Sequence, residues 1–132
     1  MNEKIFQKVK DLNLPIGKYI IFGSGPLAIR NLKIPHDIDI LVTQDVYDRY
    51  KQKNEWQEKE YNQDLYLEND ENIELWCNWR PGEWNIQKLI NEAEIIDDLP
   101  FVKLEYVLKW KKQNGRPKDL EDIKKIEDKI NN

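Results

Sequence analysis

Two aspartates stand at the head of an apolar run, and this short segment constrains the fold more than any other part of the chain. Asp37 and Asp39 lie two residues apart and are followed by Ile40-Leu41-Val42. Because side chains alternate between the faces of a strand, both carboxylates would share one face and the apolar residues the other. Neighbouring carboxylates repel each other. The pair therefore predicts a hard cation such as Mg2+, which commonly binds phosphate-bearing substrates as well.

A Gly-Ser pair ends an earlier apolar run, residues 19–22. Gly23 permits a tight turn from a strand into a helix, and Ser24 stands where that helix should begin. The hydroxyl and the exposed backbone N–H groups at such a position can bind phosphate. The segment lacks the Gly-Lys-Ser/Thr of a Walker loop and the third glycine of a dinucleotide fingerprint. It therefore indicates a different type of phosphate site.

This combination of Gly23-Ser24, a helix and then Asp37-x-Asp39 resembles the signature of the DNA polymerase β-like nucleotidyltransferase superfamily. The resemblance implies that Gly23 and Ser24 hold a triphosphate and that Asp37 and Asp39 bind one or two Mg2+ ions. A third carboxylate lies on a later strand in that superfamily. Glu74 is the best candidate for it, so the implied catalytic and metal-binding residues are Asp37, Asp39 and Glu74.

Glu74 lies in a strand-like run with apolar neighbours, as a carboxylate pointing out of a sheet should. In the superfamily the third carboxylate assists deprotonation of the attacking hydroxyl, which implies the same role here. Asp64 and Glu68 are weaker competitors because their segment is acidic and typical of a solvated surface. Trp76 shares the face of Glu74 and could stack on a base, although packing is the commoner role of such a side chain.

The C-terminal part of the chain carries a second resemblance, through Arg116-Pro117-Lys118-Asp119 and the following Asp122-Ile123. It resembles the tail of many small bacterial and archaeal nucleotidyltransferases, including some abortive-infection toxins. The resemblance implies that Arg116 and Lys118 contribute to nucleotide binding. Both belong to residues 109–118, where five residues are basic and none is acidic. A solvated helix end is the alternative, because cations favour helix C-termini.

Hydrophobic periodicity and turn residues predict an α/β (α+β) fold. We expect helices at 3–12, 24–32, 43–53, 86–93, 103–113 and 118–130, strands at 18–22, 37–42, 65–67 and 73–78, and an edge strand at 95–96. This order gives a polymerase β-like nucleotidyltransferase core: a mixed sheet with helices packed on it and a helical C-terminal end. At 132 residues the whole chain, 1–132, fits a single nucleotidyltransferase domain.

Composition and charge indicate where the protein acts and which partners it does not favour. No apolar run approaches the roughly 20 residues that cross a bilayer, and no signal-peptide segment is evident, so a cytoplasmic protein without membrane contacts is expected. The net charge of −4 argues against strong non-specific binding to nucleic acid. The single cysteine, Cys77, cannot form an internal disulfide and is expected to be a buried thiol.

The resemblance implies a Mg-dependent nucleotidyltransferase that transfers a nucleoside monophosphate, with AMP from ATP favoured, and releases pyrophosphate. The sequence does not distinguish among three kinds of acceptor: a small molecule, a tRNA or a protein. A chain this short leaves little surface for acceptor recognition, so a homodimer or a partner subunit could complete the site. Two alternatives remain: a catalytically silent module that binds a nucleotide or a partner, and a toxin–antitoxin or defence component that acts on tRNA or on a partner protein.

Overall fold

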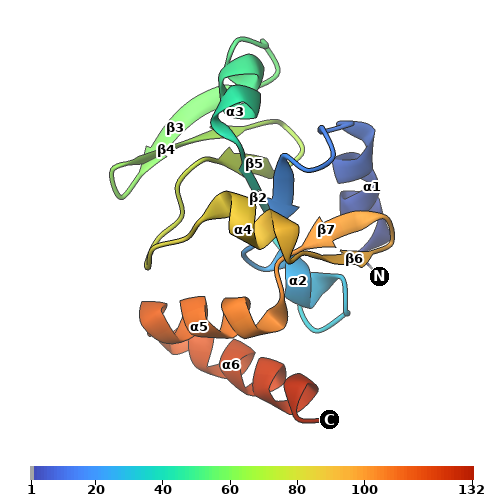
Figure 1. The fold of residues 1–132 in the computed structure, drawn as a ribbon, viewed down its shortest axis with the longest axis vertical. Coiled ribbons are helices and arrows are strands. Elements are labelled where there is room, and N and C mark those ends of the chain that lie inside the picture. The colour runs from blue at the N-terminus through green and yellow to red at the C-terminus, as the bar shows by residue number, and fades with distance from the viewer. Residues whose placement is uncertain (1) are drawn as a thin grey trace.

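The computed structural model describes residues 2–132, which form a seven-stranded sheet with helices packed around it (Figure 1). The elements are, in chain order, α1 (Glu3–Asp11), β1 (Tyr19–Ile21), α2 (Gly25–Ala28), β2 (Ile38–Val42), α3 (Gln44–Lys51), β3 (Gln57–Tyr61), β4 (Asp64–Glu68), β5 (Ile73–Trp76), α4 (Ile86–Asn91), β6 (Glu94–Ile96), β7 (Leu99–Phe101), α5 (Leu104–Asn114) and α6 (Pro117–Ile130). In Figure 1, α5 and α6 lie side by side below the sheet. The expected α/β architecture with a helical C-terminal end is confirmed.

The sheet is mixed, with the strand order β3-β4-β5-β2-β1-β7-β6. Two neighbouring pairs run parallel, β2 with β5 and β1 with β7, and the other pairs are antiparallel. The β2–β5 pair places two strands next to each other that are far apart in the sequence. Strand β2 therefore lies inside the sheet, where carboxylates at its N-terminal end are held by backbone on both sides.

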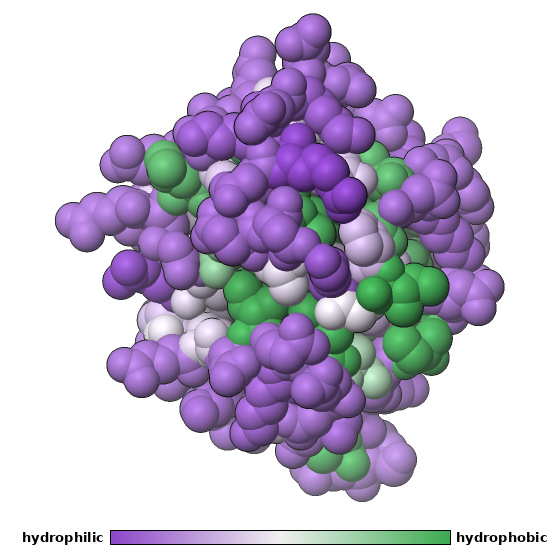
Figure 2. Space-filling view, turned by 45° about the horizontal axis from the view of Figure 1, so that its top comes forward, coloured by the Kyte–Doolittle hydropathy of each residue, from purple (hydrophilic) through white to green (hydrophobic). Residues whose placement is uncertain are grey.

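Alternation along the central strands divides the apolar residues between two cores. Ile21, Ile40 and Val42 face a cluster that includes residues of α1 and α3. Ile20, Phe22 and Leu41 face a second cluster that includes residues of α4, α5 and α6. Figure 2 shows one face of the molecule, where hydrophilic side chains surround a central patch of hydrophobic ones.

Three local features differ from the sequence prediction. The helix expected at 24–32 is the single turn α2, because Asn31 adopts a left-handed conformation (φ 60°) that ends the helical path. Strand β3 lies within the ambiguous segment 55–67, and strand β7 was not predicted. Strand β7 is short and joins the sheet through the register pair Ile21↔Phe101.

The turn between β4 and β5 is fixed by one side chain. The Oδ1 atom of Asn69 accepts hydrogen bonds from the backbone N–H groups of Glu71 and Ile73, each at 3.0 Å. Such side-chain bonds to the backbone two and four residues on are typical of asparagine in turns. This turn delivers Ile73 into β5 and thereby sets the position of Glu74.

Helices α5 and α6 meet around a buried lysine. Lys111, only 2% exposed, lies 3.4 Å from Asp119 Oδ1 and 3.0 Å from Asp122 Oδ2. A buried ammonium needs such partners because burial without them is costly. Gly115, in a left-handed conformation, ends α5 before Pro117 starts α6, as the sequence indicates. Within residues 2–132, no helix has the length and apolar character needed to span a bilayer.

Candidate metal and nucleotide site

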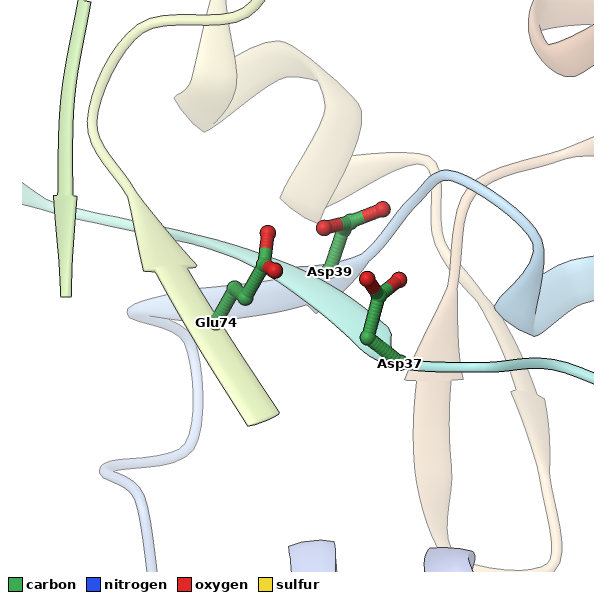
Figure 3. Close-up of side chains that lie close together, drawn as sticks. All are labelled: Asp37, Asp39 and Glu74. Atoms are coloured by element: carbon green, nitrogen blue, oxygen red, sulfur yellow. The ribbon is translucent and has the colours of Figure 1, made fainter. Parts of the chain in front are cut away.

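Parallel pairing of β2 and β5 brings three carboxylates together. Asp39 and Glu74 are register partners on these strands, and Asp37 directly precedes β2. The pairing continues past the strand end, since the backbone N–H of Ile38 donates to the carbonyl of Asn72 at 3.0 Å. Figure 3 shows the three side chains on the same side of the sheet, pointing toward one another. The structure thus juxtaposes the three carboxylates that the sequence singled out.

The cluster has the dimensions and chemistry of a cation site. Asp37, Asp39 and Glu74 each offer one oxygen atom, and these atoms all lie within 4.8 Å of one another. Glu74 is 8% exposed, and the two aspartates are half-buried. A donor set made only of carboxylate oxygens suits hard divalent cations such as Mg2+ and Mn2+. The three residues therefore fit a divalent metal, whose identity the donor set alone does not fix.

The electrostatics of the cluster agree with this assignment. Burial, reinforced by the charge of Asp37, raises the pKa of Asp39 from 3.8 to about 6. Burial also raises the pKa of Glu74, and a hydrogen bond to Asp39 and the charges of both aspartates raise it further. Without a cation, such a group retains a proton because its members cannot all ionise at close range. A divalent cation would replace that proton and allow all three carboxylates to ionise.

The Gly23-Ser24 turn packs directly against the carboxylates. The backbone N–H of Phe22 donates to the carbonyl of Asp39 at 3.0 Å, and the Ser24 hydroxyl lies 3.5 Å from the carbonyl oxygen of Asp37. Gly23 has φ 61°, and a Cβ atom there would collide with the Asp39 carboxylate. Glycine is required at this position both for its backbone conformation and for the space it leaves. The turn and the carboxylates form one continuous surface.

The two competitors for the third carboxylate have other partners. Asp64 is buried, contrary to the solvated segment expected, and accepts a hydrogen bond at 2.8 Å from Arg80 Nε. Glu68 is the register partner of Glu74 on β4 and forms an ion pair with Lys59 on β3, but it is not one of the three carboxylates that meet. Glu74 is therefore the side chain that completes the group around Asp39.

The predicted nucleotide-binding cations lie at the start of α6, Arg116 as its N-cap and Lys118 in its first turn. Arg116 is paired with Asp119 at 2.8 Å, and its guanidinium lies 5.8 Å from the Trp110 ring centre. Lys118 lines a cleft of about 600 Å³ between residues 31–34 and α6, together with Lys33 and Lys125. Within the described chain, 2–132, neither Arg116 nor Lys118 forms an ion pair with the three carboxylates.

Sequence reasoning missed one cation close to the site. Lys111 is buried between α5 and α6, and its charge lowers the pKa of Asp39, although burial has the larger and opposite effect. In the sequence it belongs to the basic stretch 109–118 and looks like an exposed helix residue. Only the aspartates that α6 brings to it distinguish it from its neighbours.

A comparison with solved structures identifies the fold. The crystal structure of a candidate nucleotidyltransferase from Thermotoga maritima matches with a TM-score of 0.53, over 96% of this chain and 90% of the other. The chain has a nucleotidyltransferase-like fold. The two sequences are 18% identical, so the comparison shows a similar fold and nothing more specific. No protein-family model and no curated protein sequence matches the chain.

Proposed function

We propose that this chain is a divalent-metal-dependent nucleotidyltransferase, which transfers a nucleoside monophosphate from a nucleoside triphosphate to an acceptor and releases pyrophosphate. The observation that carries the proposal is the cluster of Asp37, Asp39 and Glu74 beside the Gly23-Ser24 turn in a nucleotidyltransferase-like fold. The donor set favours Mg2+, and the superfamily resemblance favours ATP, hence transfer of AMP.

The carboxylates and the turn would divide the work of binding the metal–nucleotide ligand. Asp37, Asp39 and Glu74 would hold one or two ions. When bound, such an ion neutralises phosphate charge and orients the reacting oxygens. Ser24 would bind a phosphate through its hydroxyl and backbone N–H, and the bare Gly23 lets the Asp39 carboxylate lie directly against the turn that holds this phosphate.

The reaction would form a bond between the acceptor oxygen and the α-phosphorus while the bond from this phosphorus to the β-phosphate oxygen breaks. Pyrophosphate leaves with the electron pair of the broken bond. Glu74, as a carboxylate, would take the proton that the acceptor hydroxyl loses. Its place on β5 as the register partner of Asp39 supports this role, because it puts a carboxylate next to the proposed metal ligands of β2.

Lys118 and Arg116 would contact the outer phosphates from the side of α6. Lys118 lines the cleft beside residues 31–34, so its ammonium could approach a ligand that extends from the carboxylates along this segment. Arg116 would have to exchange part of its pairing with Asp119 for a phosphate oxygen. Of the two, Lys118 requires the smaller rearrangement.

The proposed unit is a single nucleotidyltransferase domain that acts in the cytoplasm. The acceptor is a molecule with a free hydroxyl, whether small molecule, tRNA or protein, and a second copy or a partner subunit would help to bind it. A role in a toxin–antitoxin or defence pair belongs to the same proposal, with the acceptor then on tRNA or on a partner protein.

Calorimetric titration with a non-hydrolysable ATP analogue tests the proposal. We expect binding to the wild type that requires Mg2+ and that is lost in an Asp37→Asn/Asp39→Asn double variant. The exposed Asp45, which pairs with Lys18, provides a control, and Asp45→Asn should bind like the wild type. Failure of the wild type to bind any of the four nucleotides with Mg2+ would contradict the proposal. Metal-dependent binding without pyrophosphate release with any acceptor would favour a silent module.

A further inference from the structure

The Glu74 carboxyl has a fixed hydrogen-bond donor on its own strand. Trp76 lies two residues further along β5 and on the same face. Its indole N–H donates to Glu74 Oε1 at 3.2 Å, and Trp76 is only 8% exposed. Because water has little access to this bond, the partners cannot readily exchange it for hydration.

Two aromatic rings hold the indole in place. Tyr66, the register partner of Trp76 on β4, stacks against it with 4.4 Å between ring centres and an interplanar angle of 11°. Trp79 meets it edge to face at 5.5 Å and 88°. A ring packed on its face and at its edge cannot turn without disturbing its neighbours, so the N–H direction is set by packing.

The acceptor of this hydrogen bond belongs to the carboxylate cluster. Glu74 is the register partner of Asp39, and its carboxylate lies within 4.8 Å of those of Asp37 and Asp39. Groups that donate hydrogen bonds to metal-binding carboxylates orient them, and their loss typically weakens metal binding by about 10–100-fold. Trp76 has the placement of such a group, while its burial leaves little of the ring for contact with a base.

We propose that Trp76 is a positioning residue of the metal site: its indole N–H holds the Glu74 carboxyl where it meets Asp37 and Asp39. This role rests on the proposed function, since it requires that the three carboxylates bind a cation. In this role, the stacking of Tyr66 on Trp76 keeps the Glu74 carboxyl, the third metal ligand, in place.

The test compares two conservative variants by titration with Mn2+ alone. Trp76→Phe removes the N–H and keeps an aromatic ring against Tyr66. Trp110→Phe is the matched control, because Trp110 is also buried (7% exposed) and donates one hydrogen bond, at 2.9 Å, to the carbonyl of Arg80. We expect about tenfold weaker Mn2+ binding in Trp76→Phe and less than a twofold change in Trp110→Phe.

The outcomes separate this inference from the function on which it rests. Wild-type affinity in Trp76→Phe overturns the positioning role and leaves the metal site standing. A wild type that binds no Mn2+ overturns both. Equal weakening in the two variants also overturns the role, because a general loss of packing would then account for it.

A spectroscopic measurement keeps the inference testable if Trp76→Phe does not fold. In 1H–15N spectra, the Trp76 indole signal is assigned through its contact with the Tyr66 ring. Glu74→Gln replaces the carboxyl group that accepts this hydrogen bond with an amide. The chemical shift of the Trp76 indole signal should therefore change more than that of the Trp110 indole signal. A Trp76 signal that moves no further than that of Trp110 overturns the inference.

Discussion

Replacing Asp39 by asparagine should stabilise the metal-free protein and abolish its stabilisation by Mg2+. Burial, with the charge of Asp37 adding to it, raises the pKa of Asp39 from 3.8 to about 6. Folding therefore costs free energy whenever this carboxyl is ionised, because the unfolded chain keeps the same charge in water. Asparagine retains the size of aspartate without the charge.

The magnitude follows from the change in pKa. A displacement of about 2 units corresponds to about 3 kcal/mol at neutral pH, which sets the upper limit of the gain. Asp39 is only half-buried, and the amide will not match every hydrogen bond of the carboxyl. We therefore expect the free energy of unfolding to rise by about 1–2 kcal/mol, or the Tm by about 5 °C for a domain of this size.

The gain should depend on pH in one direction. Below the ordinary pKa of 3.8 the carboxyl is protonated in both the folded and the unfolded wild type, so the variant has no advantage. Between 3.8 and about 6 the unfolded chain ionises first, and wild-type stability falls relative to the variant as the pH rises. Above that range the difference is constant.

Urea unfolding followed by tryptophan fluorescence measures this difference, near neutral pH and near pH 4, with EDTA or with saturating MgCl2. With EDTA at neutral pH the variant should be the more stable protein. With MgCl2 the order should reverse, because only the wild type gains free energy from the bound ion. Asp45→Asn is the control: hydrogen bonding to Lys18 lowers the pKa of that exposed carboxyl to about 2, so its neutralisation should not stabilise the fold.

Two results would refute the reasoning. One is an Asp39→Asn variant that is no more stable than the wild type in EDTA at neutral pH. The other is an equal gain at neutral pH and near pH 4, since that would trace the effect to packing and not to charge.

Three further predictions concern the surroundings of the site. Gly23→Ala should lower the free energy of unfolding by about 1–3 kcal/mol and weaken Mn2+ binding, because the added Cβ would collide with Asp39. Gly17 is also at positive φ but faces open space, so Gly17→Ala should lower stability without changing the Mn2+ affinity measured by titration. Lys111→Met should cost about 1–3 kcal/mol in urea unfolding, because it leaves Asp119 paired with Arg116 alone and Asp122 paired with Lys33 alone, and Lys112→Met should change little. Burial opposes ionisation of Asp122, but hydrogen bonds to two lysines outweigh it and lower the pKa of this carboxyl. Its contribution to the free energy of unfolding should therefore be full above about pH 4 and decline as the pH falls further. Asp122→Asn should reduce this loss of stability at acid pH in urea unfolding.

The parts of the structure that the sequence predicted well carry strong local signals. Asp37 and Asp39 stand at the start of an apolar run, and Glu74 lies between apolar neighbours, so alternation predicted which face each carboxylate takes, although Asp37 itself lies just before β2. Their convergence required the parallel pairing of β2 and β5, which alternation cannot specify and which the sequence did not predict; the superfamily resemblance implied only that a carboxylate on a later strand joins the two aspartates.

The features that escaped prediction depend on contacts that are distant in the sequence. All residues of β3 are exposed, so Gln57–Tyr61 shows no apolar alternation and is a strand because β4 pairs with it. Lys111 looks solvated until α6 supplies its two aspartates. The role of Trp76 as a hydrogen-bond donor to Glu74 depends on rotamers, which a sequence pattern does not encode.

The Asn69 turn affects the candidate metal site through the register of β5, although Asn69 is not one of its three carboxylates. Because the side-chain period of a strand is two, a slip of β5 by one residue would exchange its two faces and move Glu74 away from Asp39, even if every apolar residue found a new partner. Asn69 holds the backbone of residues 71 and 73 and so resists this slip. A turn residue outside the carboxylate group thus governs whether the chain has three carboxylates at one point or only two.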